Sequence, residues 1–471
     1  MEMYKDILVN TVYLIASFLF IFGIKMLSSP TKARKGNFYS AVGMFLAVVV
    51  TLLNEHILTY EYILIGIVIG SAIGSVLALK VEMTAMPQMV GLLNGFGGGA
   101  SALVGLTEYF QILDPTITRV EEFTIKMAIT IALSIIIGGI TFTGSLVAFG
   151  KLQGIVSGNV IKFPLQHPLN LLLLVGVFGL MVVGAIHPTD QTIFLVILGI
   201  SLLLGILLVI PIGGADMPVA ISLLNSYSGI AASATGFVID NNMLIIAGAL
   251  VGASGIILTN IMCKAMNRSL LNVVMGGWGQ NAAAEASSGT KKEVIVKSID
   301  SEEAAMIFSA ASSVMVIPGY GMAVAQAQHA VKELMDVLNK KGCDVKFAIH
   351  PVAGRMPGHM NILLAESNVP YEKLYALEDI NEEFTNTDIS LIIGANDVVN
   401  PAARNNPASP IYGMPILNAD HSKTVIIIKR SMAAGYAGID NELFYNQNTL
   451  MYFGDAKEAI NKLNNELKNL S

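Results

Sequence analysis

Long apolar stretches dominate the first 270 residues of the chain. A helix needs about 20 consecutive, mostly apolar residues to cross a bilayer. The first stretch is too long for a signal peptide, and its positive charges follow it rather than precede it. Nine stretches meet the requirement, so the two ends of the chain are predicted to lie on opposite sides of a membrane. Their ranges are roughly 7–27, 39–54, 62–79, 86–106, 126–149, 168–187, 191–210, 217–238 and 243–262.

Composition supports this division of the chain. Of the 471 residues 54% are hydrophobic and 13% charged, whereas soluble domains are about 45–50% apolar and about 25% charged. This excludes a purely soluble protein, a disordered chain and a nucleic-acid-binding protein. The net charge of −6 falls entirely after residue 270. We therefore expect a transmembrane domain over 1–270, a linker over 271–292 and a soluble domain over 293–471.

Positive charges in the connections predict the orientation, because Lys and Arg gather on the cytosolic side. The alternate connections that would share a side with the N-terminus carry Lys5, Arg119 and Lys126. The other set carries three times as many: Lys25, Lys32, Arg34, Lys35, Lys80, Lys151, Lys162, Lys264 and Arg268. We expect the N-terminus outside and the soluble domain in the cytoplasm.

Small and polar residues form stripes along several predicted spans. In the third span Gly66, Gly70 and Gly74 predict close helix packing. Similar stripes lie on the fourth, fifth, eighth and ninth spans. The fourth and eighth also contain Asn94 and Asn225, and a mid-span amide is costly in hydrocarbon unless it serves a function.

No span carries a mid-span Lys, Arg or carboxylate. The pattern is compatible with a narrow proton path through waters and amides. Asp216 and Glu82 lie at predicted cytosolic helix ends, where a coupling role and a solvated helix-terminal acid are both open.

The C-terminal half alternates strand-like and helix-like segments, which predicts an α/β fold with a parallel sheet. Predicted strands cover 313–317, 345–349, 389–393, 425–429 and 450–453, and a final helix covers 456–470. The first strand leads into Gly319-x-Gly321-x-x-Val324 and a helix to about residue 340. This context suits a dinucleotide fingerprint, in which glycines admit a pyrophosphate to a helix N-terminus.

The second strand ends without the acidic residue that an NAD site uses for the ribose hydroxyls. Lys429, Arg430 and Ser431 end a later strand and could hold a 2′-phosphate, although a solvated strand end is also open. NADP is therefore favoured over NAD.

Two further loops follow predicted strands, at the sheet edge where open α/β folds bind ligands. They are 350–359 (HPVAGRMPGH) and 394–397 (GAND). We assign no histidine as a ligand and expect no metal, because no zinc spacing is present. Cys263 and Cys343 do not suggest a disulfide framework.

Nine segments are distinctive: 80–84 (KVEMT), 144–151 (GSLVAFGK), 212–218 (IGGADMP), 224–229 (LNSYSG), 261–269 (IMCKAMNRS), 318–328 (PGYGMAVAQAQ), 350–360 (HPVAGRMPGHM), 394–397 (GAND) and 429–432 (KRSM). Taken together and in this order, they resemble the β subunits of proton-translocating NAD(P) transhydrogenases along nearly the whole chain.

The resemblance implies hydride transfer from NADH to NADP⁺, coupled to inward proton movement in a bacterial inner membrane. It implies a Rossmann-like domain that binds NADP(H) upside down beneath a lid loop. The lid would be Val352, Ala353, Gly354, Arg355, Met356 and Pro357. The 2′-phosphate would lie against Lys429, Arg430 and Ser431.

The rest of the implied pocket comprises Gly319, Tyr320, Gly321, Val324, Gly394, Ala395, Asn396, Asp397, Val398, Gly413, Met414, Met432, Ala433, Ala434, Gly435, Tyr436, Asp455 and Ala456. Asp397 and Arg355 are the expected catalytic residues, and Asp216, Glu82 and Asp397 the expected linkage between proton and nucleotide.

The resemblance also implies an α subunit that carries the NAD(H) domain, because only one fingerprint is found here. A dimer of αβ units, surrounded by lipid, is expected. Some family members have a histidine where this chain has Asn94, so we expect the titrating histidine on the partner, with Asn94 and Asn225 holding water.

Two other function classes are weighed against this one. A cation channel or transporter with a regulatory nucleotide-binding domain would need a filter or a mid-span acid for ions. A membrane-anchored NADPH reductase would need a flavin or metal site. Neither signature is present.

Overall fold

The computed structural model describes residues 2–27, 30–54, 60–114, 124–274, 296–409, 411–435 and 437–470. Arg119, Tyr436 and most of the predicted linker lie outside the described residues. The chain separates into two compact units. One comprises Met1–Ile212 and Ala220–Leu258, and the other Gly213–Val219 and Thr259–Ser471.

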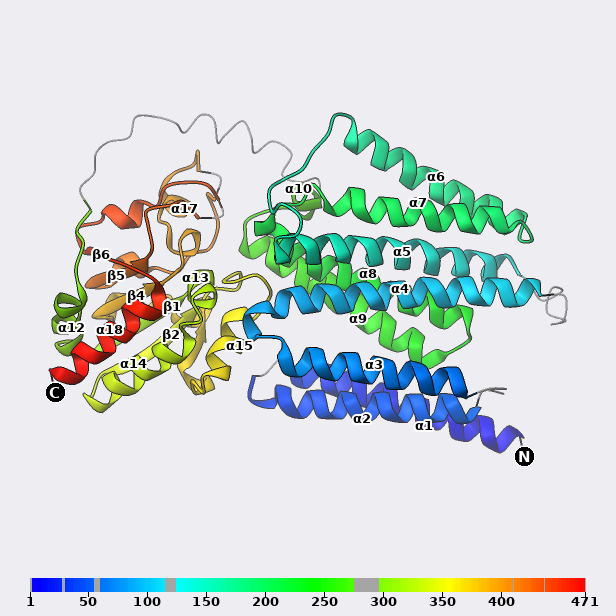
Figure 1. The fold of residues 1–471 in the computed structure, drawn as a ribbon, viewed down its shortest axis with the longest axis horizontal. Helices are drawn as coiled ribbons and strands as arrows, with labels where there is room; N and C mark the ends of the chain where they lie inside the picture. The colour runs from blue at the N-terminus through cyan, green and yellow to red at the C-terminus, as the bar shows by residue number, and fades with distance from the viewer. Residues whose placement is uncertain are drawn as a thin grey trace. The chain divides into compact units, whose positions relative to one another are not determined.

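In the part of the chain that the structure describes, nine long helices occupy the nine predicted ranges (Figure 1). They are α1 (Glu2–Leu27), α2 (Pro30–Asn54), α3 (Glu61–Lys80), α4 (Met86–Leu113), α5 (Ile125–Gln153), α6 (Gln166–Ile186), α7 (Gln191–Val209), α8 (Met217–Val238) and α9 (Asn242–Ala265). A 3-10 turn, η1 (Met83–Ala85), precedes α4, and a short helix, α10 (Leu270–Val274), follows α9. Among the described helices, eight are long and apolar enough to cross a membrane. The chain is thus a multi-pass membrane protein.

The remaining long helix, α8, is not among those eight. It is 22 residues long, but serines, a threonine and an asparagine interrupt its apolar sequence. Its hydroxyls find partners on neighbouring helices. Ser226 Oγ donates to the Gly252 carbonyl over 2.6 Å, and the Ser134 and Thr235 hydroxyls lie 2.6 Å apart. Hydrogen bonds of this kind offset the cost of polar groups in hydrocarbon.

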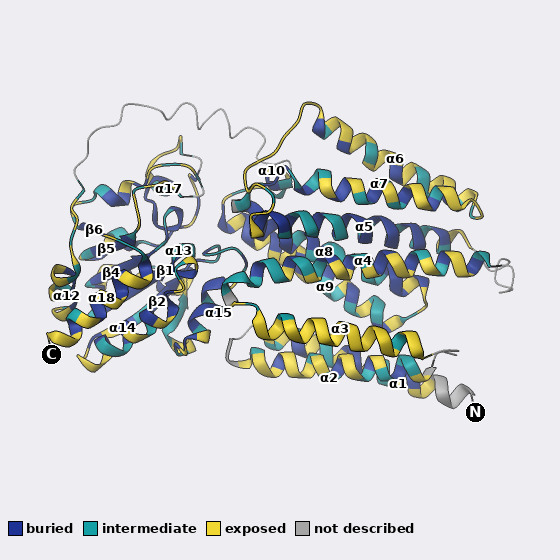
Figure 2. Ribbon diagram, in the orientation of Figure 1, coloured by how far each residue is buried: buried dark blue, intermediate teal, exposed yellow. Residues whose placement is uncertain are grey.

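The stripes of α4 and α5 face each other. A Cβ atom on Gly98 would lie 2.7 Å from Thr141 Cβ, and one on Gly138 would lie 2.8 Å from the Ala102 nitrogen. Glycine therefore lets these two backbones approach closely. Figure 2 shows buried residues along much of α5.

The stripe of α3 differs from the prediction. A Cβ atom on Gly66, Gly70 or Gly74 would meet no atom within 4 Å, and α3 has no buried residue. Nearly all of α3 is exposed in Figure 2. Close packing along this stripe is therefore not seen among the described residues.

The soluble half contains a six-stranded parallel sheet in the order β3-β2-β1-β4-β5-β6. The strands are β1 (Ser313–Pro318), β2 (Asp344–Ile349), β3 (Leu374–Ala376), β4 (Ile389–Ile393), β5 (Thr424–Lys429) and β6 (Thr449–Phe453). Continuous apolar runs form the central strands because both faces of a parallel sheet are buried. This is the doubly wound order, with its switch point between β1 and β4.

The two faces of the sheet are covered differently. One core packs α12 (Ser301–Ser309), α14 (Gln328–Lys340), α15 (His359–Glu366) and α18 (Ala456–Asn469) against the strands. The other face is covered by short elements: α16 (Leu377–Ile380), η5 (Glu383–Asn386), η6 (Asp397–Val399), α17 (Ala402–Asn405), η7 (Ala419–His421) and η8 (Glu442–Tyr445).

The helix predicted after the fingerprint is interrupted. A short helix, α13 (Tyr320–Val324), ends before α14 begins, and Gln326 between them has a φ of 49°. A left-handed residue stops a right-handed helix. The first helical turn therefore belongs to the sheet edge rather than to α14.

Candidate functional site

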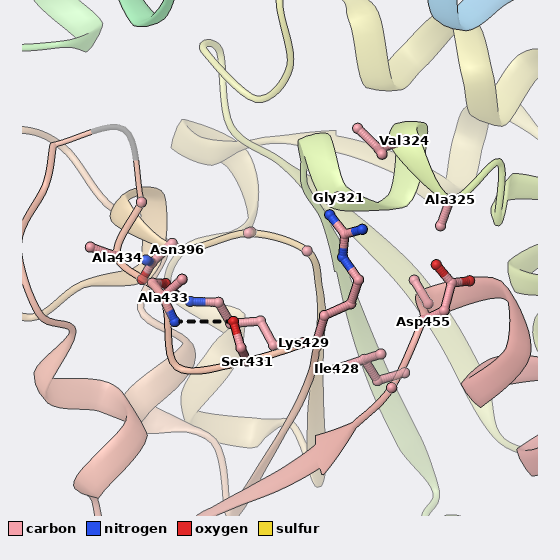
Figure 3. Close-up of a pocket in the computed structure, with 16 residues that line it drawn as sticks. Gly321, Val324, Ala325, Asn396, Ile428, Lys429, Ser431, Ala433, Ala434 and Asp455 are labelled. Carbon is pink, nitrogen blue, oxygen red and sulfur yellow. Dashed lines mark hydrogen bonds between the residues drawn. The ribbon is translucent and has the colours of Figure 1, made fainter.

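Two adjoining cavities lie at the carboxyl edge of the sheet, around the switch point between β1 and β4. The first has a volume of about 240 Å³ and extends to the ends of β5 and β6, and the second has a volume of about 300 Å³ and extends under the loop after β2. Both are lined by the loops after β1, β4 and β5. We call the two together the sheet-edge groove; Figure 3 shows the first cavity.

Most of the residues predicted for the nucleotide line this groove. They are Gly319, Tyr320, Gly321, Val324, Val352, Ala353, Gly354, Gly394, Ala395, Asn396, Asp397, Val398, Lys429, Arg430, Ser431, Ala433, Ala434, Gly435, Asp455 and Ala456. Arg355, Met356, Pro357, Gly413, Met414 and Met432 do not line either cavity.

Glycines hold the loops after β1 and β4 together at the base of the groove. The Gly319 amide donates to the Ile393 carbonyl over 2.9 Å, and the Gly321 amide donates to the Gly394 carbonyl over 3.0 Å. A Cβ atom on Gly321 would lie 2.6 Å from Gly394 Cα, and Gly394 itself has a φ of +62°. The fingerprint glycines therefore serve loop packing, which keeps the α13 N-terminus at the groove wall.

The cationic residues at the end of β5 differ in their environment. Lys429 donates to the Ala433 carbonyl over 2.6 Å and lies over the Phe444 ring at 4.6 Å from its centroid. Burial lowers the pKa of Lys429, and the nearby carboxylates of Asp397 and Asp440 oppose that shift. Arg430 is exposed and lines the first cavity. Ser431 Oγ accepts a hydrogen bond from the Ala433 amide over 3.4 Å (Figure 3).

The loop after β4 contributes the polar side chains at the centre of the groove. Asp397 is 1% exposed and its Oδ2 accepts the Ala437 amide over 3.1 Å, which ties it to the loop after β5. Asn396 lines both cavities. The Asn396 Nδ2 atom is buried and has no hydrogen-bond partner among the described residues. Such a donor suits an oxygen-rich ligand, because an unmade buried hydrogen bond is costly.

Two buried histidines hold the predicted lid. His350 Nδ1 accepts the Val352 amide over 3.2 Å, and its Nε2 lies 2.8 Å from the Pro415 carbonyl. His359 Nδ1 accepts the Arg355 amide over 3.1 Å. Burial lowers the pKa of both histidines to about 4, and the Arg355 charge adds to the shift at His359. Both rings are therefore neutral at pH 7.

Arg355 stacks on Tyr320, with its guanidinium carbon 4.3 Å from the ring centroid. Stacking of this kind is a cation–π contact. It joins the lid to the turn after β1. Gly354, one residue earlier, has a φ of +105°, and a Cβ atom there would lie 2.6 Å from His359 Cβ. The lid backbone therefore depends on glycine at this position.

In the membrane half, Asn94 Nδ2 donates to Ser145 Oγ over 2.9 Å, and Ser228 Oγ donates to the Asn94 carbonyl over 3.2 Å. Asn225 is half-buried on α8. Asn94 thus joins α4, α5 and α8 through polar contacts.

The two acids predicted at helix ends, Asp216 and Glu82, differ in burial and in their partners. Asp216 is buried, and Arg268 Nη1 lies 2.6 Å and 2.7 Å from its two carboxylate oxygens. Glu82 is exposed and accepts a hydrogen bond from Thr84 Oγ1 over 3.3 Å. A buried and paired Asp216 differs from a solvated helix-terminal acid.

Residues that sequence reasoning did not single out also support the site. Asn441 is fully buried and donates to the backbone oxygen of Asn396 over 3.0 Å and to its Oδ1 over 2.8 Å. It stands in a polar loop with no recognisable motif. In the membrane half, Lys151 was predicted to lie in a connection, yet it is buried and donates to the carbonyls of Ile210 and Ile212 over 2.6 Å and 2.8 Å.

Two comparisons with known proteins point to the same family. The sequence pattern of the family described as NAD(P) transhydrogenase beta subunit matches residues 9–466. Two curated relatives from Rhodospirillum rubrum, both named NAD(P) transhydrogenase subunit beta, are 50% identical over 451 residues. The alignment covers 96% of this chain and 97% of each relative. These matches do not favour a channel or transporter with a regulatory domain.

Proposed function

Because the chain belongs to the family of NAD(P) transhydrogenase β subunits, we propose that it binds NADP(H) in the sheet-edge groove and takes part in proton-translocating transhydrogenation. NADH would be held by the NAD(H)-binding domain of a partner α subunit, and hydride would pass from NADH to NADP⁺. The two nicotinamides supply this chemistry, and the protein orients them and limits when they meet.

The single observation that carries the nucleotide assignment is the composition of the groove wall. Glycine-rich loops after β1 and β4 meet Lys429, Arg430 and Ser431 at the end of β5, at the switch point of a doubly wound sheet. The buried Nδ2 of Asn396 adds a donor for a ligand oxygen. A phosphorylated dinucleotide fits these groups, and Arg430 in particular suits a 2′-phosphate.

We propose the division into residues 1–270, 271–292 and 293–471 as membrane domain, linker and NADP(H) domain. The positive charges favour an outer N-terminus and a cytoplasmic NADP(H) domain in a bacterial inner membrane. The enzyme would assemble as a dimer of αβ units. Inward proton movement would use the polar contacts around Asn94 and Asn225, with Asp216 and Glu82 at the cytosolic end.

A titration of the full-length protein in detergent with NADPH and with NADH, followed by nucleotide fluorescence, tests the cofactor. We expect tight binding of NADPH and weak binding of NADH. Equal affinity for the two would contradict a 2′-phosphate site. Binding of neither would contradict the assignment of the groove.

Asp397 is our proposed link between the nucleotide and the proton. It is buried, and its carboxylate holds the loop after β5 through the Ala437 amide. Its protonation would weaken that hold and so alter release of the nucleotide. The Asp397→Asn variant should therefore release NADP(H) at a rate independent of pH, and an unchanged pH dependence would remove Asp397 from this role.

A further inference from the structure

A chain of directed hydrogen bonds runs from the start of η8 to the wall of the sheet-edge groove. It begins with the Leu443 amide, which donates to Asn441 Oδ1 over 3.0 Å. A backbone amide is only a donor, so this contact identifies Oδ1 as the atom of the Asn441 side chain that faces Leu443. The Nδ2 atom of Asn441 must then face the other way.

The next contact is equally directed. Asn441 Nδ2 lies 3.0 Å from the backbone oxygen of Asn396, which is only an acceptor, and 2.8 Å from Asn396 Oδ1. Asn441 is fully buried, so water does not compete with these bonds. Rotating the Asn396 amide by half a turn would place two NH₂ groups against each other.

The consequence appears at the groove. With its Oδ1 held by Asn441, Asn396 offers Nδ2 on its free side, and this atom is buried without a partner among the described residues. Asn396 lines both cavities of the groove. Its neighbours on the wall are mainly glycines and alanines, which supply no side-chain hydrogen bonds.

We propose that Asn441 is a positioning residue that fixes the Asn396 amide with its donor towards the groove. The groove thereby selects an oxygen acceptor of the bound nucleotide at this point. The inference rests on the proposed function, because the ligand is taken to be NADP(H).

A test uses the full-length protein and NADPH fluorescence as the readout of binding. Asn441→Ser keeps an oxygen for the Leu443 amide, since serine is a good helix N-cap. Its side chain is too short to hold Asn396. Asn441→Asp keeps the shape but replaces the donor by an acceptor, which turns the Asn396 amide around. We expect each variant to bind NADPH roughly tenfold more weakly, the effect of one lost hydrogen bond to a polar or charged ligand group.

Asn400 is the matched control. Like Asn441, it is fully buried. Its Oδ1 accepts a hydrogen bond from the Ala402 amide over 3.1 Å, and its Nδ2 donates to the carbonyl of Asp440, the residue before Asn441, over 3.0 Å. It lines neither cavity. Asn400→Ser should loosen the loop as Asn441→Ser does, and Asn400→Asp should add the same charge as Asn441→Asp. Both control variants should keep NADPH affinity within about twofold of the wild type.

A double-mutant cycle separates positioning from loosening. If Asn441 acts through Asn396, the double variant Asn396→Ala/Asn441→Ser should bind NADPH no more weakly than Asn396→Ala alone. Additive losses of NADPH affinity in the double variant, or losses of the same size in the Asn400 variants, would overturn the inference. The proposed function, NADP(H) binding in the groove, would still stand. Failure of the wild-type protein to bind NADPH would overturn the proposed function and this inference with it.

Discussion

The amide of Gly321 donates to the carbonyl oxygen of Gly394 over 3.0 Å, so the turns after β1 and β4 are joined by backbone alone. A Cβ atom on Gly321 would lie 2.6 Å from Gly394 Cα. Real Cβ atoms do not approach this closely, and the backbone atom opposite cannot rotate away. The floor of the sheet-edge groove therefore depends on two glycines that follow different strands and are far apart in the sequence.

The variant Gly321→Ala should be less stable than the wild type and should lose NADPH binding. Overpacking of this kind costs about 1–3 kcal/mol, which is several degrees of unfolding temperature for a domain of this size. Thermal unfolding of the purified protein measures the change. Gly454→Ala is the comparison, because its Cβ atom would lie 3.6 Å from Ala459 Cβ, an ordinary contact. Equal unfolding temperatures for the two variants would contradict the steric argument.

Arg430 should decide between NADPH and NADH. It is exposed in the first cavity. Hydrogen bonds to charged groups contribute about 1.5–3 kcal/mol. We therefore expect Arg430→Ala to bind NADPH about 10- to 100-fold more weakly and NADH as the wild type does. Lys423→Ala, at the opposite end of β5, should change neither affinity, and a loss there would point to a general effect of charge.

The pH dependence of stability follows from His350 and His359. Burial lowers the pKa of each to about 4, whereas an unfolded histidine has a pKa of about 6.5. The unfolded chain therefore binds more protons than the folded chain between these values. The stability from these residues is complete above about pH 6.5 and is lost as the pH falls towards 4.

Unfolding temperatures measured from pH 7.5 to pH 5 should fall with a slope set by both histidines. His359→Gln keeps an acceptor for the Arg355 amide and removes one titrating ring, so its slope should be shallower. His329→Gln, which replaces an exposed histidine away from the lid, is the matched control. A wild-type slope in His359→Gln would show that folding does not lower the pKa of His359.

For the ion pair of Asp216 and Arg268, we expect loss of one partner to destabilise the protein more than loss of both. The two side chains are 9% and 12% exposed, so removal of one partner leaves a largely buried charge. Arg268→Met should lower stability by about 3–5 kcal/mol, and the double variant Asp216→Leu/Arg268→Met should recover most of that loss. Lys332→Met, at a more accessible i,i+4 pair with Asp336 whose side chains are 22% and 47% exposed, should have a much smaller effect. A double variant less stable than Arg268→Met would contradict this view.

The linear sequence determined the membrane helices and the central strands. Apolar runs of sufficient length have few alternatives to a helix in lipid, and the continuous runs around Val316, Leu391 and Ile427 suit buried parallel strands. β3 was not predicted, because three residues carry too weak a signal. The break between α13 and α14 was not predicted either, since it depends on a left-handed Gln326 rather than on proline or glycine.

The groove shows the same contrast. Glycines, lysine and arginine at strand ends indicated a phosphate-binding edge, because their chemistry is visible in the residue type. Only the tertiary structure decided that Lys429 folds onto the Ala433 carbonyl and that Asn441 orients Asn396 from 45 residues away. Local sequence specifies periodicity and residue chemistry, whereas the direction of a buried amide depends on partners that the fold brings together.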